Sequence, residues 1–163
     1  MFRILFLFTY LFVSILESQS NSEDFDDLLD ACDRGDLKTV KIVLGNGVKI
    51  NGKAESGKLA GKTPLMIASS KGKKEIVKLL IENGADLNIR DEGKGSSKRQ
   101  NFEGWTALHY AADADQDQVV KILVQNGADV NIRTKSGLSA IQIARLWQNE
   151  DMIRILRNAG AEE

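Results

Sequence analysis

The chain has little of the chemistry on which most catalytic and metal sites depend. Its 163 residues include one cysteine, Cys32, and one histidine, His109. An internal disulfide is therefore excluded, and so are zinc sites built on a pair of histidines. No serine, cysteine or carboxylate stands at a spacing that would make it a catalytic partner of His109. We therefore expect no enzymatic activity, no cofactor and no metal site.

The chain also lacks an excess of charge of either sign. It has 22 Lys and Arg residues against 23 Asp and Glu residues, for a formal net charge of -1. Proteins that bind the phosphate backbone usually carry a clear basic excess, so nucleic acid is not an expected partner. The length fits one domain, and the 42% hydrophobic and 28% charged residues are ordinary globular values. We expect a monomer.

The first 20 residues have the order of segments found in secretory signal peptides. Arg3 precedes the apolar run 4–16, which is too short to span a bilayer comfortably. Ser18 and Ser20 put small side chains three residues and one residue before a cleavage site. We expect residues 1–20 to be a signal peptide, and the remainder to be exported to the periplasm or secreted without stable membrane insertion. The alternative is an uncleaved leader that tethers the chain to a membrane.

Two short phrases recur through the rest of the chain in a fixed order. The phrase TALHYA at Thr106 recurs 33 residues later as SAIQIA at Ser139, and 43 residues earlier as TPLMIA at Thr63. The phrase N-G-A-D-L/V-N follows at Asn83 and Asn126. Such self-similarity at a fixed period is the signature of a repeat protein. The repeats cover about 23–51, 61–90, 104–133 and 137–163.

Each unit has the pattern of two short helices. Apolar residues recur at i, i+3 and i+4, as in Ile76, Leu79 and Leu80, which is one face of a helix. This face ends near Gly84, and in the next unit near Gly127, where a left-handed C-terminal turn favours glycine. One pair of short helices cannot bury its apolar face alone, so neighbouring units must stack into a solenoid.

The first helix of each unit has its own start signal. Thr63 followed by Pro64 is typical of an N-cap and a first helical residue. The equivalent capping oxygens are expected from Asp26, Thr106 and Ser139. Pro64 and the capping residues therefore have a structural role in this interpretation.

These residues strongly resemble the ankyrin repeat. The T-P-L-H-x-A phrase, the V-V-x-L-L helix and the G-A-D-V-N ending all appear, best between Thr106 and Asn131. The resemblance implies an all-α ankyrin-repeat solenoid of four helix-turn-helix units with short hairpin-like turns. It also implies that His109 is structural and hydrogen-bonds neighbouring backbone. Together with the leader, the chain is similar to signal-bearing ankyrin proteins of bacterial type.

Two of the turns carry insertions. The shorter precedes Thr63, and the longer is the loop 91–103, which is rich in glycine, serine and charged residues and shows no apolar face. We expect this loop to be a mobile finger at the tips of the turns. A surface insertion without function is the alternative, because long loops cost little stability.

Candidate binding residues stand where the repeat pattern does not require a particular side chain. They lie just before the Thr phrase, on the first helix or at its end, and the resemblance places them along the turns and the concave groove. Aromatic anchors near charges are typical of interface hot spots. Packing is the alternative role for both tryptophans, under the long loop for one and against the C-terminal cap for the other. The candidates are Arg34, Lys62, Lys71, Trp105, Tyr110, Asp113, Leu138 and Trp147.

The sequence therefore favours a non-enzymatic scaffold in the cell envelope or secreted, which binds a partner protein through the concave face and turn tips of its repeats. A secreted effector would use the same surface on host proteins. A nucleotide binder is the remaining alternative, because residues 56–63 (SGKLAGKT) nearly match a phosphate-binding loop. The first glycine of that motif is replaced by Ser56, and Thr63 is in phase with the capping residues of the other repeats.

Overall fold

The computed structural model describes residues 22–95 and 101–162, and within them the chain forms only helices, turns and loops. The predicted leader, 1–20, lies outside the described residues. The described part of the N-terminal helix is 22–34. The other helices are α2 (Leu37–Gly45), the 3₁₀ turn η1 (Gly57–Leu59), α3 (Pro64–Ser70), α4 (Lys74–Glu82), α5 (Ala107–Asp113), α6 (Asp117–Gln125), α7 (Ala140–Leu146) and α8 (Glu150–Asn158).

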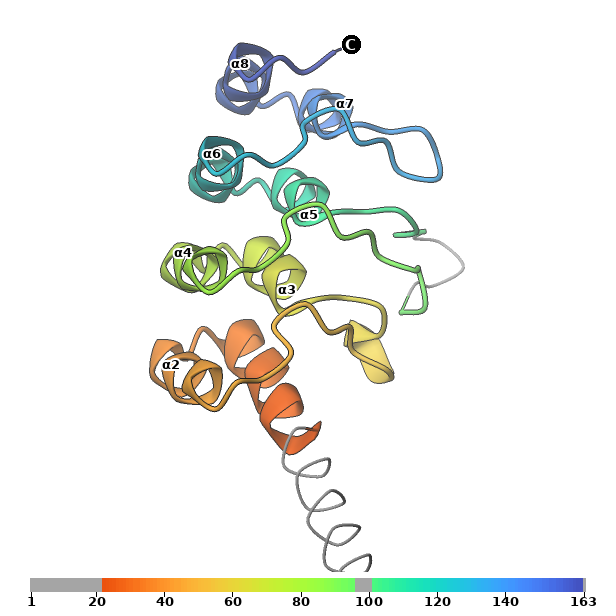
Figure 1. Cartoon of the computed structure of the whole chain (residues 1–163). Helices are drawn as coiled ribbons and strands as arrows, with labels where there is room; N and C mark the ends of the chain where they lie inside the picture. The colour runs from red at the N-terminus through yellow and green to blue at the C-terminus, as the bar shows by residue number, and fades with distance from the viewer. Residues whose placement is uncertain (1–21, 96–100, 163) are drawn as a thin grey trace, which may run out of the picture.

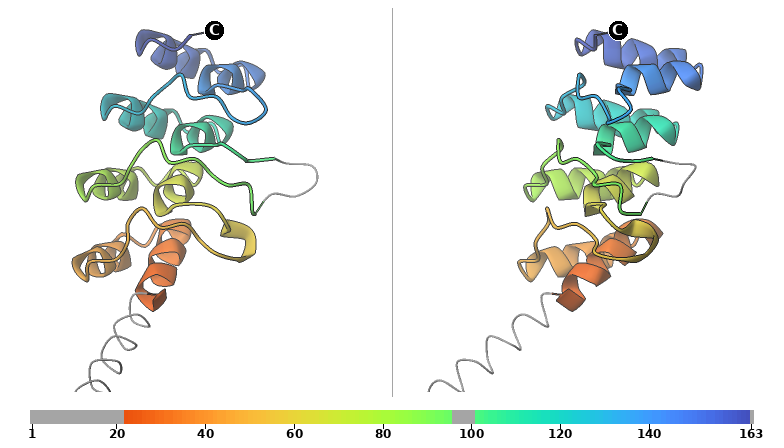
Figure 2. Two further views of the ribbon diagram at one scale, coloured as in Figure 1. Left: turned by 45° about the vertical axis from the view of Figure 1, so that its right-hand side comes forward. Right: turned by 90° about the vertical axis from the view of Figure 1, so that its right-hand side faces the viewer.

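Four antiparallel helix pairs stack into two columns. The N-terminal helix, α3, α5 and α7 form the inner column, and α2, α4, α6 and α8 form the outer column (Figures 1 and 2). Contacts run along each column, from α3 to α5 to α7 and from α2 to α4 to α6 to α8. The connections that lead into α3, α5 and α7 project to the same side of the inner column (Figure 1). The prediction of an all-α solenoid of four helix-turn-helix units is confirmed.

The core lies between the two columns and repeats with the sequence. Each burial of a leucine-sized side chain stabilises the fold by about 1.5–3 kcal/mol relative to its exposure. Because the equivalent position in the next unit holds a similar side chain, the core continues from one pair of helices to the next. Fully buried residues at equivalent positions are Leu65, Leu108 and Ile141 in the inner column and Leu80, Leu123 and Leu156 in the outer column.

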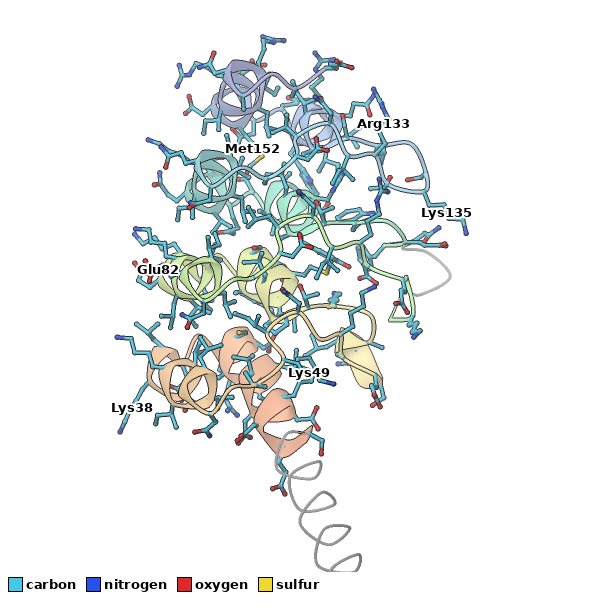
Figure 3. The ribbon with its side chains drawn as sticks, in the orientation of Figure 1. Lys38, Lys49, Glu82, Arg133, Lys135 and Met152 are labelled. Carbon is cyan, nitrogen blue, oxygen red and sulfur yellow. The ribbon has the colours of Figure 1, made fainter. Side chains whose placement is uncertain are left out.

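The polar face of the solenoid is on the outer helices. Figure 3 shows Lys38 and Glu82 on the outer column, on the opposite side of the molecule from Lys135 in the last long turn. Met152, by contrast, is fully buried between the columns. Each outer helix therefore has one buried apolar face and one charged face in solvent, as the spacing of its apolar residues predicts.

The inner helices begin where the sequence phrases begin. The Thr63 hydroxyl accepts a hydrogen bond from the backbone N–H of Met66 at 3.3 Å, and Pro64 is the first helical residue. The equivalent prediction for Asp26 is wrong, because the N-terminal helix already includes residue 22 and Asp26 is exposed inside it. The acidic residue there marks the surface of a longer helix and not its start.

Residues with a left-handed backbone conformation lie after each outer helix and in the turn between the inner and outer helix of a pair. Gly84 and Gly127, which follow the outer helices, have φ of 87° and 88°. Between the inner and outer helices Gly72 has φ of 64°, but Asp115 and Gln148 take the same place in the next two units with φ of 58° and 56°. A side chain in this region costs free energy that glycine does not. The last two turns are therefore locally strained relative to the others.

Asparagine side chains join each unit to the next. The Asn51 amide donates to the Gly84 carbonyl at 3.2 Å and accepts from the N–H of Asp86 at 2.8 Å. Asn131 repeats this arrangement with Gly160 and Glu162, at 3.2 and 2.8 Å. The final residue of the G-A-D-V-N phrase therefore ties the backbone of consecutive turns together.

Candidate protein-interaction surface

The eight candidate binding residues fall into two groups in the structure. Those at the base of the long turns are enclosed by neighbouring side chains, and those at the ends of the inner helices face solvent. The first group is Lys62, Trp105, Tyr110 and Leu138, and the second is Arg34, Lys71, Asp113 and Trp147.

Trp105 and Tyr110 belong to the interior. They are 8% and 4% exposed. Their ring centroids are 5.2 Å apart, and the Phe102 ring lies 5.0 Å from that of Trp105 and 5.5 Å from that of Tyr110. Such aromatic pairs stabilise beyond the area they bury. Both pack under the long loop and not on the surface, which corrects Tyr110 as a surface contact residue and for Trp105 is the alternative role that the sequence left open.

Lys62 covers this aromatic cluster from the neighbouring unit. Its Nζ lies 4.7 Å from the ring centroid of Tyr110 and 5.1 Å from that of Phe102, within cation–π range. Partial burial lowers the pKa of Lys62, and the charge of Asp91 opposes that shift. Lys62 therefore holds two units together, and only part of its side chain remains for a partner.

Asp91 fixes the base of the long loop. The carboxylate is 3% exposed, accepts the hydroxyl of Tyr110, and accepts the N–H of Gly93 at 2.7 Å. Its backbone N–H donates to Trp105 O at 2.7 Å, and its carbonyl accepts from Gly104 N–H at 2.8 Å. Burial, and then the hydrogen bond to Asp91, raise the pKa of Tyr110. Tyr110 is therefore a neutral donor to a buried carboxylate.

The expectation of a mobile finger over 91–103 is therefore wrong at both ends of the loop. Asp91 is buried at one end, and Phe102 packs on the core at the other. Residues 96–100 lie outside the described part of the chain. Sequence reasoning missed both anchors, because an isolated Asp and Phe in a polar stretch give no periodic signal.

Charged pairs brace the outer part of the long turns. Lys135 Nζ lies 2.7 Å from the Glu103 carboxylate, and the two residues also share a backbone hydrogen bond of 3.0 Å. Lys53 lies 2.8 Å from Glu92, whose pKa is lowered to about 2 by hydrogen bonds from Lys53 and Lys94. Exposed pairs of this kind add little stability individually. Each of the pairs Lys53–Glu92 and Lys135–Glu103 joins one turn to the next.

His109 joins the third and fourth units as a neutral side chain. Its Nδ1 accepts from the Thr106 N–H at 3.2 Å and lies 2.8 Å from the Thr106 hydroxyl. Its Nε2 lies 3.3 Å from the carbonyl of Leu138, which requires a proton on Nε2. Burial lowers the pKa of His109 to about 4. Both ring nitrogens are engaged in the fold, which leaves neither for acid–base chemistry.

The exposed candidates form one row along the turns between inner and outer helices. We call this the turn row and define it by Arg34, Lys71, Asp113 and Trp147. At its first half Lys71 Nζ lies 3.0 Å from the carboxylate of Asp33 in the preceding unit. At its second half the indole Nε1 of Trp147 donates to the Asp113 carboxylate at 3.3 Å. Each contact crosses from one repeat to the next, the first between units one and two and the second between units three and four.

The end of the turn row at α7 exposes apolar side chains. Leu146 is 70% exposed and Trp147 is 59% exposed. The other large exposed hydrophobic residue of the described part is Ile42, on the outer helix α2. Two adjacent large apolar residues in solvent are a feature that packing within the chain does not account for.

The segment that nearly matches a phosphate-binding loop is organised as a repeat turn. Residues Gly57–Leu59 form a 3₁₀ turn, and the buried Thr63 hydroxyl caps α3. Lys62 points to aromatic rings. These contacts occupy the two side chains that would have to hold phosphate and magnesium, and the geometry does not favour a nucleotide site.

The thiol of Cys32 is buried. Burial raises the pKa of the Cys32 thiol to about 12, so it is a poor nucleophile. No cluster of three possible metal ligands occurs among residues 22–95 and 101–162. None of the helices over these same ranges has the length and apolar character needed to cross a membrane.

Comparison with known proteins agrees with this architecture. The family model for ankyrin repeats (3 copies) matches residues 12–91 and 92–163. The chain therefore belongs to the ankyrin-repeat family, whose members generally act as non-enzymatic modules for binding other proteins. The first match begins inside the segment predicted to be a leader.

Two curated relatives share part of the chain. A putative ankyrin repeat protein of Rickettsia bellii is 40% identical over 65 residues, which is 39% of this chain and 9% of the relative. A BTB/POZ domain-containing protein 3 of Schizosaccharomyces pombe is 37% identical over 82 residues, 50% of this chain and 15% of the relative. The matched regions thus span a small part of these longer proteins.

Proposed function

We propose that this chain is an exported adaptor without enzymatic activity, and that it binds a partner protein through the turn row. The observation that carries the proposal is the exposed Leu146–Trp147 pair, which lies on the same edge as the charged residues Arg34, Lys71 and Asp113. Tryptophan and arginine are the side chains most enriched among residues that dominate binding energy. The core residues recur in every unit, so specificity must come from such variable positions.

Export rests on the order of segments at the N-terminus. A basic residue, a short apolar run and small residues before Asn21 are what a signal peptidase requires. The final compartment is the periplasm or the medium, and a secreted effector would use the turn row on host proteins. Intact mass of the native protein tests this step: loss of residues 1–20 supports export, and a full-length mass in the membrane fraction supports a tethered adaptor.

Capture of partners tests the binding surface. The protein, expressed from its full coding sequence, is used as bait in envelope and secreted fractions. It is compared with a variant that combines Lys71→Ala and Trp147→Ala. Ile42→Ala is the matched control, because Ile42 is equally exposed but lies on the outer column.

We expect a partner that is retained by the wild type and by Ile42→Ala and lost by the double variant. Thermal unfolding of all three proteins is the check that they remain folded. Retention by the double variant, or loss in Ile42→Ala alone, would contradict the assignment of the turn row.

A further inference from the structure

We propose that the C-terminal end of the turn row is a site for an arginine side chain of the partner protein. The site, which we call the Trp147 patch, consists of Asp113, Asp115, Leu146 and Trp147. This inference rests on the proposed function, because it assumes that the ligand is a protein. It adds the chemistry by which the partner is recognised.

The apolar half of the Trp147 patch has no cover in the described chain. Leu146 and Trp147 are adjacent at the end of α7, and both are more than half exposed. The indole N–H of Trp147 donates a hydrogen bond to Asp113. This contact fixes the indole beside the preceding unit and leaves much of its surface in solvent.

The charged half of the patch carries negative charge without a counterion. Asp115 and Asp117 accept the amide of Asn149 at 2.6 and 2.8 Å, and Asp113 accepts the indole of Trp147. These donors are neutral, and neither Asp113 and Asp115 of the patch nor the adjoining Asp117 forms an ion pair with another described residue. The first half of the turn row differs, because there Lys71 neutralises Asp33.

An arginine satisfies both halves of the patch at once. A guanidinium stacks on the face of a tryptophan and forms paired hydrogen bonds with a carboxylate. The aliphatic part of its side chain can lie on an apolar surface such as Leu146. An acidic segment would be repelled by Asp113 and Asp115. Charge complementarity therefore selects a basic partner segment with an apolar residue beside its arginine.

Selection from a display library of random peptides tests this chemistry. The full-length protein is immobilised, and enriched peptides are resynthesised with a fluorescent label for anisotropy titration. We expect arginine next to an aliphatic residue to be enriched. Replacement of that arginine by citrulline, which has the same shape without the charge, should weaken binding at least tenfold.

Protein variants locate the site. Asp113→Asn and Trp147→Ala should each weaken the selected peptide at least tenfold. Asp33→Asn, at the other end of the turn row, and Ile42→Ala, on the outer column, should leave its affinity within twofold. Enrichment of acidic peptides, or no enrichment, overturns the arginine site.

One further outcome separates the two proposals. If the selected peptide binds unchanged to Asp113→Asn and Trp147→Ala but is lost in Lys71→Ala, the Trp147 patch is wrong and the turn row remains the binding surface. If binding is unaffected by all of these substitutions and the bait retains no partner, both proposals fail.

Discussion

The two tryptophans of this chain stand at positions that the repeat pattern leaves open, yet the structure uses them in opposite ways. Trp105 is buried against Phe102 and Tyr110 at the base of the long loop. Trp147 lies in solvent at the end of α7, with one hydrogen bond to Asp113. The insertion before α5 supplies Phe102, whose ring packs against that of Trp105. A variable position in a repeat thus becomes core or surface according to the turn beside it.

Truncation of each tryptophan gives the largest contrast. Trp105→Ala should lower the free energy of unfolding by about 3–5 kcal/mol, because it leaves a cavity in the aromatic cluster. Trp147→Ala should lower it by less than about 1 kcal/mol, because the side chain is largely in water. Urea unfolding monitored by circular dichroism measures both values. Equal losses of unfolding free energy in the two variants would contradict the assignment of Trp105 to the core and Trp147 to the surface.

Acidification should lower the free energy of unfolding through His109, whose ring lies near that of Trp105. The pKa of this histidine is about 4 in the folded chain against 6.5 as its ordinary value, because burial disfavours the charged form. Between these values the unfolded chain binds more protons, so stability is full above pH 6.5 and falls as the pH drops toward 4. The difference of the two pKa values corresponds to about 3 kcal/mol.

His109→Gln is the control for that measurement. Gln142 occupies the equivalent place in the fourth unit, where its Oε1 accepts the Ser139 N–H at 2.9 Å. A glutamine at 109 can therefore accept from the Thr106 N–H without titrating. Subtracting the pH dependence of His109→Gln from that of the wild type separates the contribution of His109 to stability from the contributions of the carboxylates. Identical pH profiles would show that His109 is accessible to protons in the folded chain.

Removal of the Tyr110 hydroxyl tests the anchor of the long loop. Tyr110→Phe keeps the ring in the aromatic cluster but takes a donor from the buried carboxylate of Asp91. We expect the free energy of unfolding to fall by about 1–3 kcal/mol. Amide hydrogen exchange should also increase at Asp91 and Gly104, whose N–H groups hold the loop base. Unchanged stability and exchange would mean that the hydroxyl is satisfied by water.

The smallest effect is expected beside Trp147. Gln148→Gly should raise the free energy of unfolding by about 0.5–1 kcal/mol, because Gln148 has φ of 56° and glycine adopts this conformation without strain. Gly72 already serves the equivalent turn. The change in melting temperature, compared with that of the exposed control Gln118→Gly inside α6, shows whether the gain belongs to the turn. Destabilisation in both variants would argue against a strained turn.

The fold could be predicted from the sequence because its signals are local and repeated. Thr63 and Pro64 mark a helix start, and Gly84 marks an end, by conformational preferences that act within a few residues. The positions of the turn row could also be predicted from the sequence, because Lys71 and Trp147 stand at fixed places in the repeat. For Trp105 the sequence left packing and binding open and could not decide between them. The choice depends on Phe102, which packs against the indole ring, and on Asp91, which holds the base of the loop, and no periodic pattern records these contacts.

The indole N–H signals of the two tryptophans test the central claim most directly. The chain has two tryptophans, so a ¹⁵N-labelled sample gives two indole cross-peaks, which Trp147→Phe assigns. On titration with the captured partner or a selected peptide, we expect the Trp147 signal to shift and the Trp105 signal to stay in place. A complex in which Trp147 is unperturbed would contradict the account of this surface.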